Sequence, residues 1–375
     1  MRNNKNILKI LRKPSQAGSE FTAAAGFDMV VDNVVRIVKQ KDQHGNKQYF
    51  QTIEEFGQYI LSKKNMSCSL ETEIQESKIG GNMAIFSNAL GNLGIRVHCI
   101  GSMGFPEIYR PFHNMSDYCT LHSVCDTVEC SALEFDDGKV MMSSMEPLEE
   151  LSWETMAKRM KEQEIVNHFK NSQLIALLNW SELTRASALF ASVFEKCIEG
   201  KAQDKNKLVL IDLSDVSRKP EEEVLHILKL TECFSKYRTT IFSMNENECR
   251  LIYHALFEHD EEIIEEMSRR ISETLRIDYL IIHLRDRSYG YHDGKMALEQ
   301  GYYTAKPKLS TGGGDNFNAG FVLGILESLS LDDCLYLGNS VAGYYVRTGK
   351  SPVPQQLHDF IIVEGGGGEF DRKKG

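Results

Sequence analysis

Several features that would assign this chain of 375 residues to a membrane or nucleic-acid class are missing. No segment approaches the ~20 consecutive apolar residues that a bilayer-spanning helix needs. The N-terminal stretch MRNNKNILKILRKPSQ also lacks the uninterrupted apolar core of a secretory signal. Basic residues are in deficit, because 43 Lys and Arg stand against 53 Asp and Glu, for a formal net charge of -10. A nucleic-acid binder needs a clustered basic excess. We therefore expect a cytoplasmic protein without a membrane or nucleic-acid partner.

Other familiar signatures are also absent. The nine cysteines are an odd number and include no C-x-x-C pair or metal spacing, which predicts reduced thiols. No glycine-rich loop is followed by Gly-Lys-Ser or Gly-Lys-Thr, which excludes a Walker A loop. No early G-x-G-x-x-G occurs, which argues against a dinucleotide-dependent dehydrogenase.

What is present is a regular alternation of strands and helices. From about residue 150, the apolar runs LIALL, LVLID, TTIFSM and YLIIHL are separated by helical patterns. This alternation predicts an α/β fold with a doubly wound, mostly parallel sheet flanked by helices. A first buried strand is expected from Phe21 to Val31 (FTAAAGFDMVV). We assign residues 1–20 to an N-terminal lead-in, 21–363 to one α/β domain, and 364–375 to a disordered tail.

Two predicted hairpins, at about 33–51 and 129–145, do not follow that alternation. The second contains Asp137-Gly138, a strong two-residue turn signal. We expect the two hairpins to form a small β lid.

The strongest local signal is the glycine turn Gly312-Gly313-Gly314, followed by Asp315 and a helix that should begin at about that residue. Glycines allow a ligand to approach the backbone closely. The start of a helix offers free N–H groups to an anion. A carboxylate there can accept a proton from an attacking hydroxyl, which together suits phosphoryl transfer. The alternative is that Asp315 only caps the helix.

The segment Gly312-Gly313-Gly314-Asp315 resembles the G-A-G-D near the C-terminus of the ribokinase/PfkB carbohydrate-kinase family. The resemblance implies a ribokinase-like fold and transfer of a nucleotide's terminal phosphoryl group to a hydroxyl of a sugar or nucleoside. Asp315 would be the catalytic base, and the amides of Gly312, Gly313 and Gly314 would form the anion hole. Leu309 replaces the family's first Asp, so a neighbouring monovalent-cation site is open. Because the lid sheets of related kinases often pair, the resemblance also allows a homodimer through the lid.

The family's N-terminal motif is matched by Gly80-Gly81, which opens a helix. The resemblance implies that Gly80, Gly81 and Asn82 contact the sugar and that Asp32 binds acceptor hydroxyls. Ile85 stands where the family usually has Asn. The alternative is an ordinary helix N-terminus. Asp28, near Asp32, could contribute or could face solvent.

Nucleotide and metal roles also come from the resemblance. Asn245 and Glu248 match an N-x-x-E motif that organises Mg²⁺ and phosphates, although alone they predict a capping box. Asn339 lies in a segment that resembles the family's adenine-binding side, and the resemblance implies that it contacts the nucleotide. His283 lies at the end of the segment YLIIHL, and in this the chain resembles the ADP-dependent glucokinase and phosphofructokinase branch, where a His ends the corresponding strand. We expect ATP as the donor, with ADP as the alternative.

Three further residues follow strands, and each has two interpretations. Trp180 follows LIALL, and we favour packing over sugar stacking. Asp212 and Asp215 follow LVLI, where they could assist a metal or only end the strand. A non-catalytic sugar or nucleotide sensor is the main rival to the kinase, although a sensor would not need the base.

Overall fold

A computed structural model describes residues 4–12, 21–309 and 311–365. Part of the predicted lead-in and nearly all of the predicted tail therefore lie outside the described residues. Within the lead-in, Lys5–Leu11 form helix α1, whose Ile7 and Leu11 are buried. Among the described residues, no helix is both long enough and apolar enough to span a bilayer.

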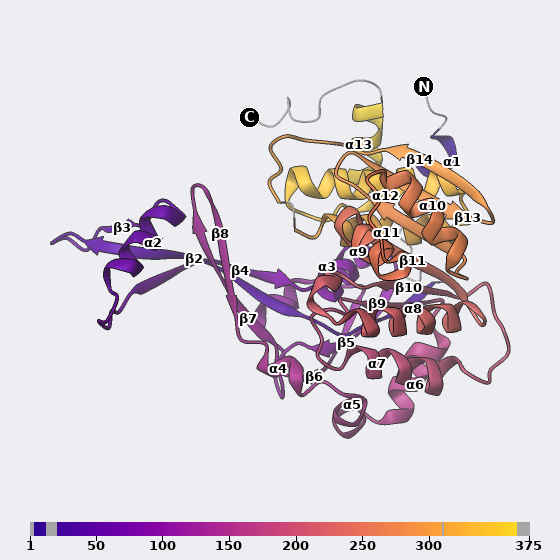
Figure 1. Cartoon of the computed structure of the whole chain (residues 1–375), viewed down its shortest axis with the longest axis horizontal. Coiled ribbons are helices and arrows are strands. Elements are labelled where there is room, and N and C mark those ends of the chain that lie inside the picture. The colour runs from indigo at the N-terminus through magenta and orange to yellow at the C-terminus, as the bar shows by residue number, and fades with distance from the viewer. Residues whose placement is uncertain (1–3, 13–20, 310, 366–375) are drawn as a thin grey trace.

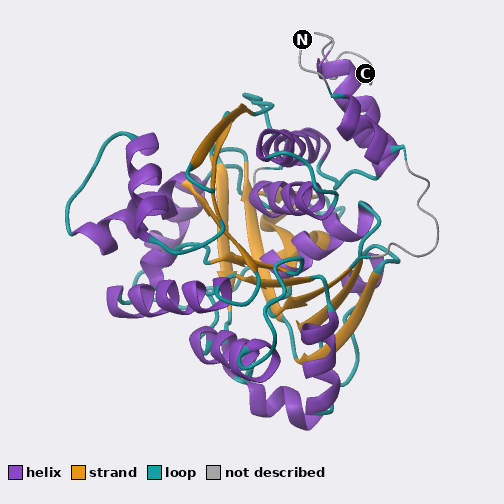
Figure 2. Cartoon of the chain, turned by 90° about the vertical axis from the view of Figure 1, so that its right-hand side faces the viewer, coloured by secondary structure: helices purple, strands orange, loops and turns teal. Residues whose placement is uncertain are grey.

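A nine-stranded sheet forms the centre of the chain (Figure 2). Its strand order is β14-β13-β12-β11-β10-β9-β1-β5-β6, and the strands from β12 to β6 are all parallel. Only the pairings of β13 are antiparallel. The strands are β1 (Thr22–Gly26), β5 (Arg96–Ser102), β6 (Cys119–Cys125), β9 (Leu174–Leu178), β10 (Leu208–Asp212), β11 (Thr239–Asn245), β12 (Tyr279–His283), β13 (Arg287–His292) and β14 (Lys295–Gln300).

Helices cover both faces of this sheet because alternate strand residues point to opposite sides. In β9, Ile175 and Leu177 join one buried cluster, whereas Leu174, Ala176 and Leu178 join another. The first cluster contains side chains of α5 (Trp153–Arg159), α6 (Glu162–Asn171), α7 (Ala186–Val193), α8 (Glu221–Ser235), α9 (Glu246–Phe257) and α10 (Ile264–Thr274). The second contains those of α1, α3 (Asn82–Asn92), α11 (Gly313–Leu326), α12 (Leu331–Thr348) and α13 (Pro354–Gly365).

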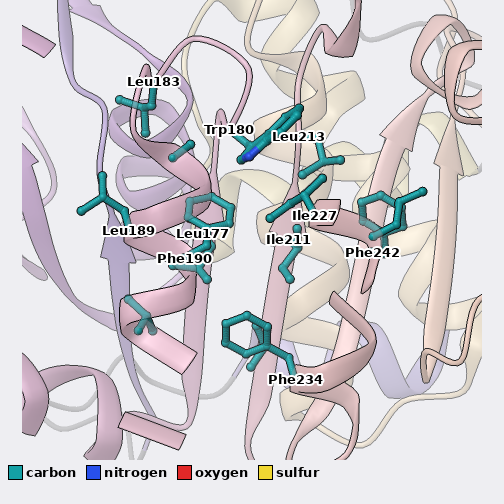
Figure 3. Packing of buried hydrophobic residues seen from close by; sticks show 14 of the residues in the cluster. Leu177, Trp180, Leu183, Leu189, Phe190, Ile211, Leu213, Ile227, Phe234 and Phe242 are labelled. Carbon is teal, nitrogen blue, oxygen red and sulfur yellow. The ribbon is translucent and has the colours of Figure 1, made fainter. Parts of the chain in front are cut away.

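The fully buried Trp180 belongs to the first cluster, where Figure 3 shows it near Leu213. Its indole Nε1 donates a hydrogen bond to Ser187 Oγ at 2.9 Å. The prediction that Trp180 is a packing residue is confirmed.

A second sheet extends away from the body of the molecule (Figure 1). Its strands are β2 (Val30–Lys41), β3 (Lys47–Tyr49), β4 (Glu71–Gly80), β7 (Val128–Phe135) and β8 (Gly138–Ser143), with α2 (Ile53–Ser62) beside them and α4 (Glu146–Glu149) following. Strand β2 pairs with β3 and β4 antiparallel and with β7 parallel. The sheet has its own small core of Val35, Ile37, Phe50, Leu133 and Phe135. We call it the lid sheet.

Two local predictions need correction. The expected single strand within Phe21–Val31 is wrong, because β1 ends at Gly26 and a new strand enters the lid sheet at Val30. Strand β4 was not predicted, since ETEIQESKIG is mostly exposed and has no clear apolar alternation. The fold class is nevertheless confirmed: a mostly parallel, helix-flanked sheet carries a separate small β sheet.

Candidate active site

Neighbouring parallel strands bring their polar C-terminal residues to one edge of the large sheet. Asp212 ends β10, Asn245 ends β11 and His283 ends β12, and these three strands are adjacent. Open α/β sheets bind ligands outside the carboxyl ends of their strands. The register pairs Asn245 with His283 directly. This edge therefore brings together residues that are more than 70 positions apart in the sequence.

The glycine turn lies at the start of α11, which begins at Gly313 rather than at about Asp315. Gly312 occupies the cap position with φ +88°, a conformation that L side chains rarely adopt. A Cβ on Gly314 would lie 2.8 Å from His283 Cε1. The interpretation of Asp315 as the helix cap is wrong, since Gly312 takes that position. The carboxylate belongs to the first helical turn.

Asp315 is buried, and its Oδ1 has no hydrogen-bond partner among the described residues. Burial, followed by the negative charges of Asp212, Asp28 and Glu248, raises the pKa of Asp315 well above its usual range. A hydrogen bond involving the Asn82 side chain acts in the opposite direction. The carboxylate is therefore short of partners and has a high affinity for a proton, as a general base requires.

Asp212 and Glu248 form a buried acidic pair on neighbouring elements. Burial and then the charge of Asp212 raise the pKa of Glu248 to about 8, and burial raises that of Asp212 to about 6. Asn318 Nδ2 donates to Asp212 Oδ2 at 2.8 Å, and Ser243 Oγ donates to Asn318 Oδ1 at 2.6 Å. This concentration of buried oxygen ligands is chemically suited to a hard divalent cation such as Mg²⁺.

The predicted capping box is also present. Glu248 Oε2 accepts from the Asn245 backbone N–H at 2.8 Å, and Asn245 Oδ1 accepts from the Glu248 N–H at 3.0 Å. Asn245 Nδ2 donates to Glu248 Oε1 at 2.6 Å. The cap holds the Glu248 carboxylate at the start of α9, so a structural role and a metal role can coexist in one side chain.

A second glycine turn lies at the start of α3. Gly81 has φ +84°, and a Cβ there would lie 2.8 Å from Asp28 Oδ2. Asp28 Oδ2 accepts from the backbone N–H of Asn82 at 2.9 Å and from Asn179 Nδ2 at 2.8 Å. Burial raises the pKa of Asp28 to about 7. The expectation that Asp28 could face solvent is wrong, since it is fully buried and anchors this turn.

Asp32 lies over the neighbouring glycine. A Cβ on Gly80 would lie 2.6 Å from Asp32 Oδ2, so a larger residue there would force the Asp32 carboxylate to move. Asp32 is half-buried, and burial raises its pKa while Lys78 and Lys139 oppose the increase. The side chain of Asn82 donates from Nδ2 to Ser214 Oγ at 3.1 Å. The turn 80–82 therefore lies between Asp28, Asp32 and the loop after β10.

Tyr345, on α12, connects the two glycine turns and was missed from the sequence. Burial and then the charges of Asp315 and Asp32 raise the pKa of Tyr345 to about 12. Its hydroxyl donates to the Thr311 carbonyl at 3.1 Å and would lie 2.8 Å from a Cβ on Gly312. No local motif marks this tyrosine, because only helix packing brings it to the turn.

Two predicted nucleotide residues have different environments. Burial lowers the pKa of His283 to about 4, and its Nε2 is buried without a partner among the described residues. It therefore offers an unused nitrogen beside Gly314. Asn339 Nδ2 instead donates to Ser288 Oγ at 2.9 Å and to the Glu299 carbonyl at 3.3 Å. Its amide ties α12 to β13 and β14, and its nucleotide role stays a prediction.

Comparisons with known proteins agree with this geometry. A sequence model of the prokaryotic ketohexokinase family matches residues 13–363. The chain is 23% identical over 337 residues to a ketohexokinase of Haloferax volcanii, which covers 89% of both chains. Among solved structures, ribokinase from Thermotoga maritima has a TM-score of 0.61 at 14% identity, covering 91% of this chain and 99% of its own.

Two further solved structures support the same fold. Ribokinase from Arabidopsis thaliana, complexed with ribose and ATP, has a TM-score of 0.61 at 14% identity and covers 91% of this chain and 98% of its own. Adenosine kinase from Sinorhizobium meliloti has a TM-score of 0.62 at 17% identity, with coverage of 91% and 98%. The predicted resemblance to ribokinase-like carbohydrate kinases is confirmed, and the chain belongs to the prokaryotic ketohexokinase family.

Proposed function

We propose that the protein transfers the terminal phosphoryl group of a nucleotide to a hydroxyl of a sugar, with a ketohexose as the first candidate. The observation that carries the proposal is the buried, incompletely paired Asp315 carboxylate one residue after the Gly312–Gly314 turn. A protein that only binds a ligand has no need for a buried carboxylate with so few partners, whereas a general base does. The ketohexose follows from the family and from the Haloferax relative.

In this mechanism Asp315 accepts the proton of the sugar hydroxyl as its oxygen attacks the terminal phosphorus. The bond from that phosphorus to the bridging oxygen breaks, and the shortened nucleotide leaves with the bond's electron pair. The backbone amides of Gly312, Gly313 and Gly314 would stabilise the transferring group at the positive end of α11. Neutral His283, beside Gly314, can donate a hydrogen bond to a phosphate oxygen if its proton is on Nε2.

The acceptor would lie toward the second glycine turn. Asp32 would bind sugar hydroxyls, and Gly80, Gly81 and Asn82 would let the sugar approach the backbone of α3's first turn. Support comes from Tyr345, whose pKa responds to both Asp32 and Asp315. The acceptor side and the proposed base are therefore within electrostatic reach of the same phenol.

Glu248, with Asp212, would hold Mg²⁺, either directly or through water. When bound, the ion would neutralise charge on the donor phosphates and lower the repulsion among these carboxylates. Asn245 holds Glu248 in place through the capping box, and Asn318 does the same for Asp212.

We propose ATP as the donor. ADP is the alternative, because His283 resembles the His that ends the corresponding strand in the ADP-dependent branch. The ATP assignment draws support from the structurally similar Arabidopsis ribokinase, whose structure is complexed with ribose and ATP. A homodimer through the lid sheet stays a prediction. Ile74 on β4 and Met142 on β8 are 59% exposed, and both lie on strands that pair on one side only within the described sheet.

The test is Asp315→Asn, assayed with a panel of ketohexoses, aldoses and nucleosides against ATP and against ADP. We expect kcat to fall about 10²–10⁴-fold, because the base is lost, while nucleotide affinity is retained. Asp117→Asn, in an exposed loop, is the matched control and should keep wild-type turnover. Wild-type turnover in Asp315→Asn would refute the base. Binding by the wild-type protein without any phosphorylated product would favour the sensor.

A further inference from the structure

Three histidines from separate elements meet on the side of the large sheet away from α11. His98 lies in β5, His122 in the edge strand β6 and His168 in α6. Helix α6 packs in the first buried cluster, whereas Gly312–Asp315 belong to a helix that packs in the second. This histidine cluster therefore lies on the opposite face of the sheet from the glycine turn that precedes Asp315.

The nitrogen atoms of the cluster are close enough to share one ion. One ligand atom from each histidine lies within 4.8 Å of the other two. His98 Nδ1 and His122 Nε2 are 3.2 Å apart. In a tetrahedral zinc site with Zn–N bonds of ~2.0–2.1 Å, two ligating nitrogens lie roughly 3.3 Å apart. That pair already has this spacing, but it is joined by a hydrogen bond, so ligation requires the shared proton to move to another ring nitrogen. The nitrogen of the third ring lies within 4.8 Å and must approach to roughly 3.3 Å.

The three rings are partly buried, which disfavours their protonated forms. Burial is the main cause that lowers the pKa of all three rings, and it lowers that of His98 to about 4. The neutral rings can each offer a lone pair, which is the form that binds metal. Arg96 lowers the pKa of His98 further, whereas Glu164 acts in the opposite direction on His122 and His168.

The three rings pack against one another with centroids 4.0–5.4 Å apart, and two further observations favour a cation at the cluster. His168 Nε2 is buried and has no hydrogen-bond partner among the described residues. Glu164, one helical turn earlier, places Oε1 3.9 Å from that same nitrogen. An ion there would satisfy the nitrogen and attract the carboxylate, which could supply a fourth ligand or bind through water.

We propose that His98, His122 and His168 form a binding site for a divalent transition-metal ion, with Zn²⁺ the best match. Three imidazoles suit Zn²⁺ and exclude the oxygen-preferring Mg²⁺ and Ca²⁺. The ion would link α6 to both β5 and β6. Strand β6 lies at the edge of the large sheet, where it pairs with β5 alone. The site is structural, because it lies away from the strand ends that carry Asp212 and Asn245.

The test is metal titration of the full-length, untagged protein, so that no added histidines compete. We expect one Zn²⁺ per chain by competition with a chromophoric chelator. Co²⁺ should give a visible d–d spectrum without a thiolate charge-transfer band. His168→Gln should weaken Zn²⁺ binding by more than the ~10–100-fold that loss of an outer-shell partner costs. His226→Gln, exposed on α8, is the control and should bind as the wild type does.

Three results would overturn the proposal: no Zn²⁺ binding by the wild type, equal affinity in His168→Gln, or a thiolate spectrum that assigns the ion to cysteines. If His168→Gln fails to fold, paramagnetically shifted imidazole N–H signals of the Co²⁺-loaded wild type decide how many histidines ligate. Zn²⁺ should also raise the melting temperature of the wild type but not of the variant. Sugar phosphorylation with Mg²⁺ is a separate readout, so failure of the kinase proposal would not affect this one.

Discussion

A single methyl group should distinguish the glycines at the start of α11. Gly312 has φ +88°, and its added Cβ would lie 2.8 Å from the Tyr345 hydroxyl and 3.1 Å from two carbons of Ile85. The φ of Gly313 lies outside the left-handed region, and its added Cβ would lie 3.5 Å from Val346 Cγ1, an ordinary van der Waals contact. The pair Gly312→Ala and Gly313→Ala therefore introduces the same atom one residue apart into different environments.

The expected difference follows from two contributions. Placing an L residue in the left-handed region costs about 1–2 kcal/mol. Overpacking a filled site adds about 1–3 kcal/mol. We expect Gly312→Ala to lower the free energy of unfolding by about 2–5 kcal/mol. Gly313→Ala should raise it by about 0.4–1 kcal/mol, since alanine restricts the unfolded chain without strain in the folded one.

The assay is urea denaturation followed by circular dichroism, without ligand. Tyr345→Phe in the Gly312→Ala background should recover part of the loss, because it removes the hydroxyl that the new methyl group meets. Stabilities of the two alanine variants that agree within about 0.5 kcal/mol, the range of a neutral surface substitution, would refute the reasoning.

Two further predictions concern stability. Burial raises the pKa of Asp28 to about 7 and that of Glu248 to about 8, so above about pH 6.5 these two groups hold protons in the folded protein that they lack in the unfolded chain. The free energy of unfolding of the ligand-free protein should therefore fall by roughly 2 kcal/mol from about pH 6.5 to 8, and Glu248→Gln should flatten that fall. Denaturation at both pH values measures this change in the free energy of unfolding, and a rise with pH would contradict the prediction. Trp180→Ala should lower the free energy of unfolding by about 3–5 kcal/mol, because it leaves a cavity in the core. Leu61 is 75% exposed, so Leu61→Ala should change the free energy of unfolding by less than about 0.5 kcal/mol. Similar losses in the two variants would contradict the packing role of Trp180.

Much of the candidate site could be predicted because its signals are local. Gly312, Gly314 and Gly81 serve turns whose backbone and close contacts demand glycine, so their chemistry is visible in a few consecutive letters. The helix start at Asn245 is equally local, since its cap and Glu248 are three residues apart. Strand β4 was not predicted because it has no such local signal. Its mostly exposed, charged residues form a strand only because β2 supplies their hydrogen-bond partners.

By itself, the sequence determined the alternation of strands and helices, the two glycine turns and the acidic residues that follow strands. These are properties of short segments, in which steric limits and hydrophobic periodicity act over a few residues. Only the tertiary structure decided that the charges of Asp28, Asp212 and Glu248 reach Asp315, because electrostatic coupling depends on distance and burial rather than on order in the chain. The same reason explains why the meeting of His98, His122 and His168 became visible only in the folded chain.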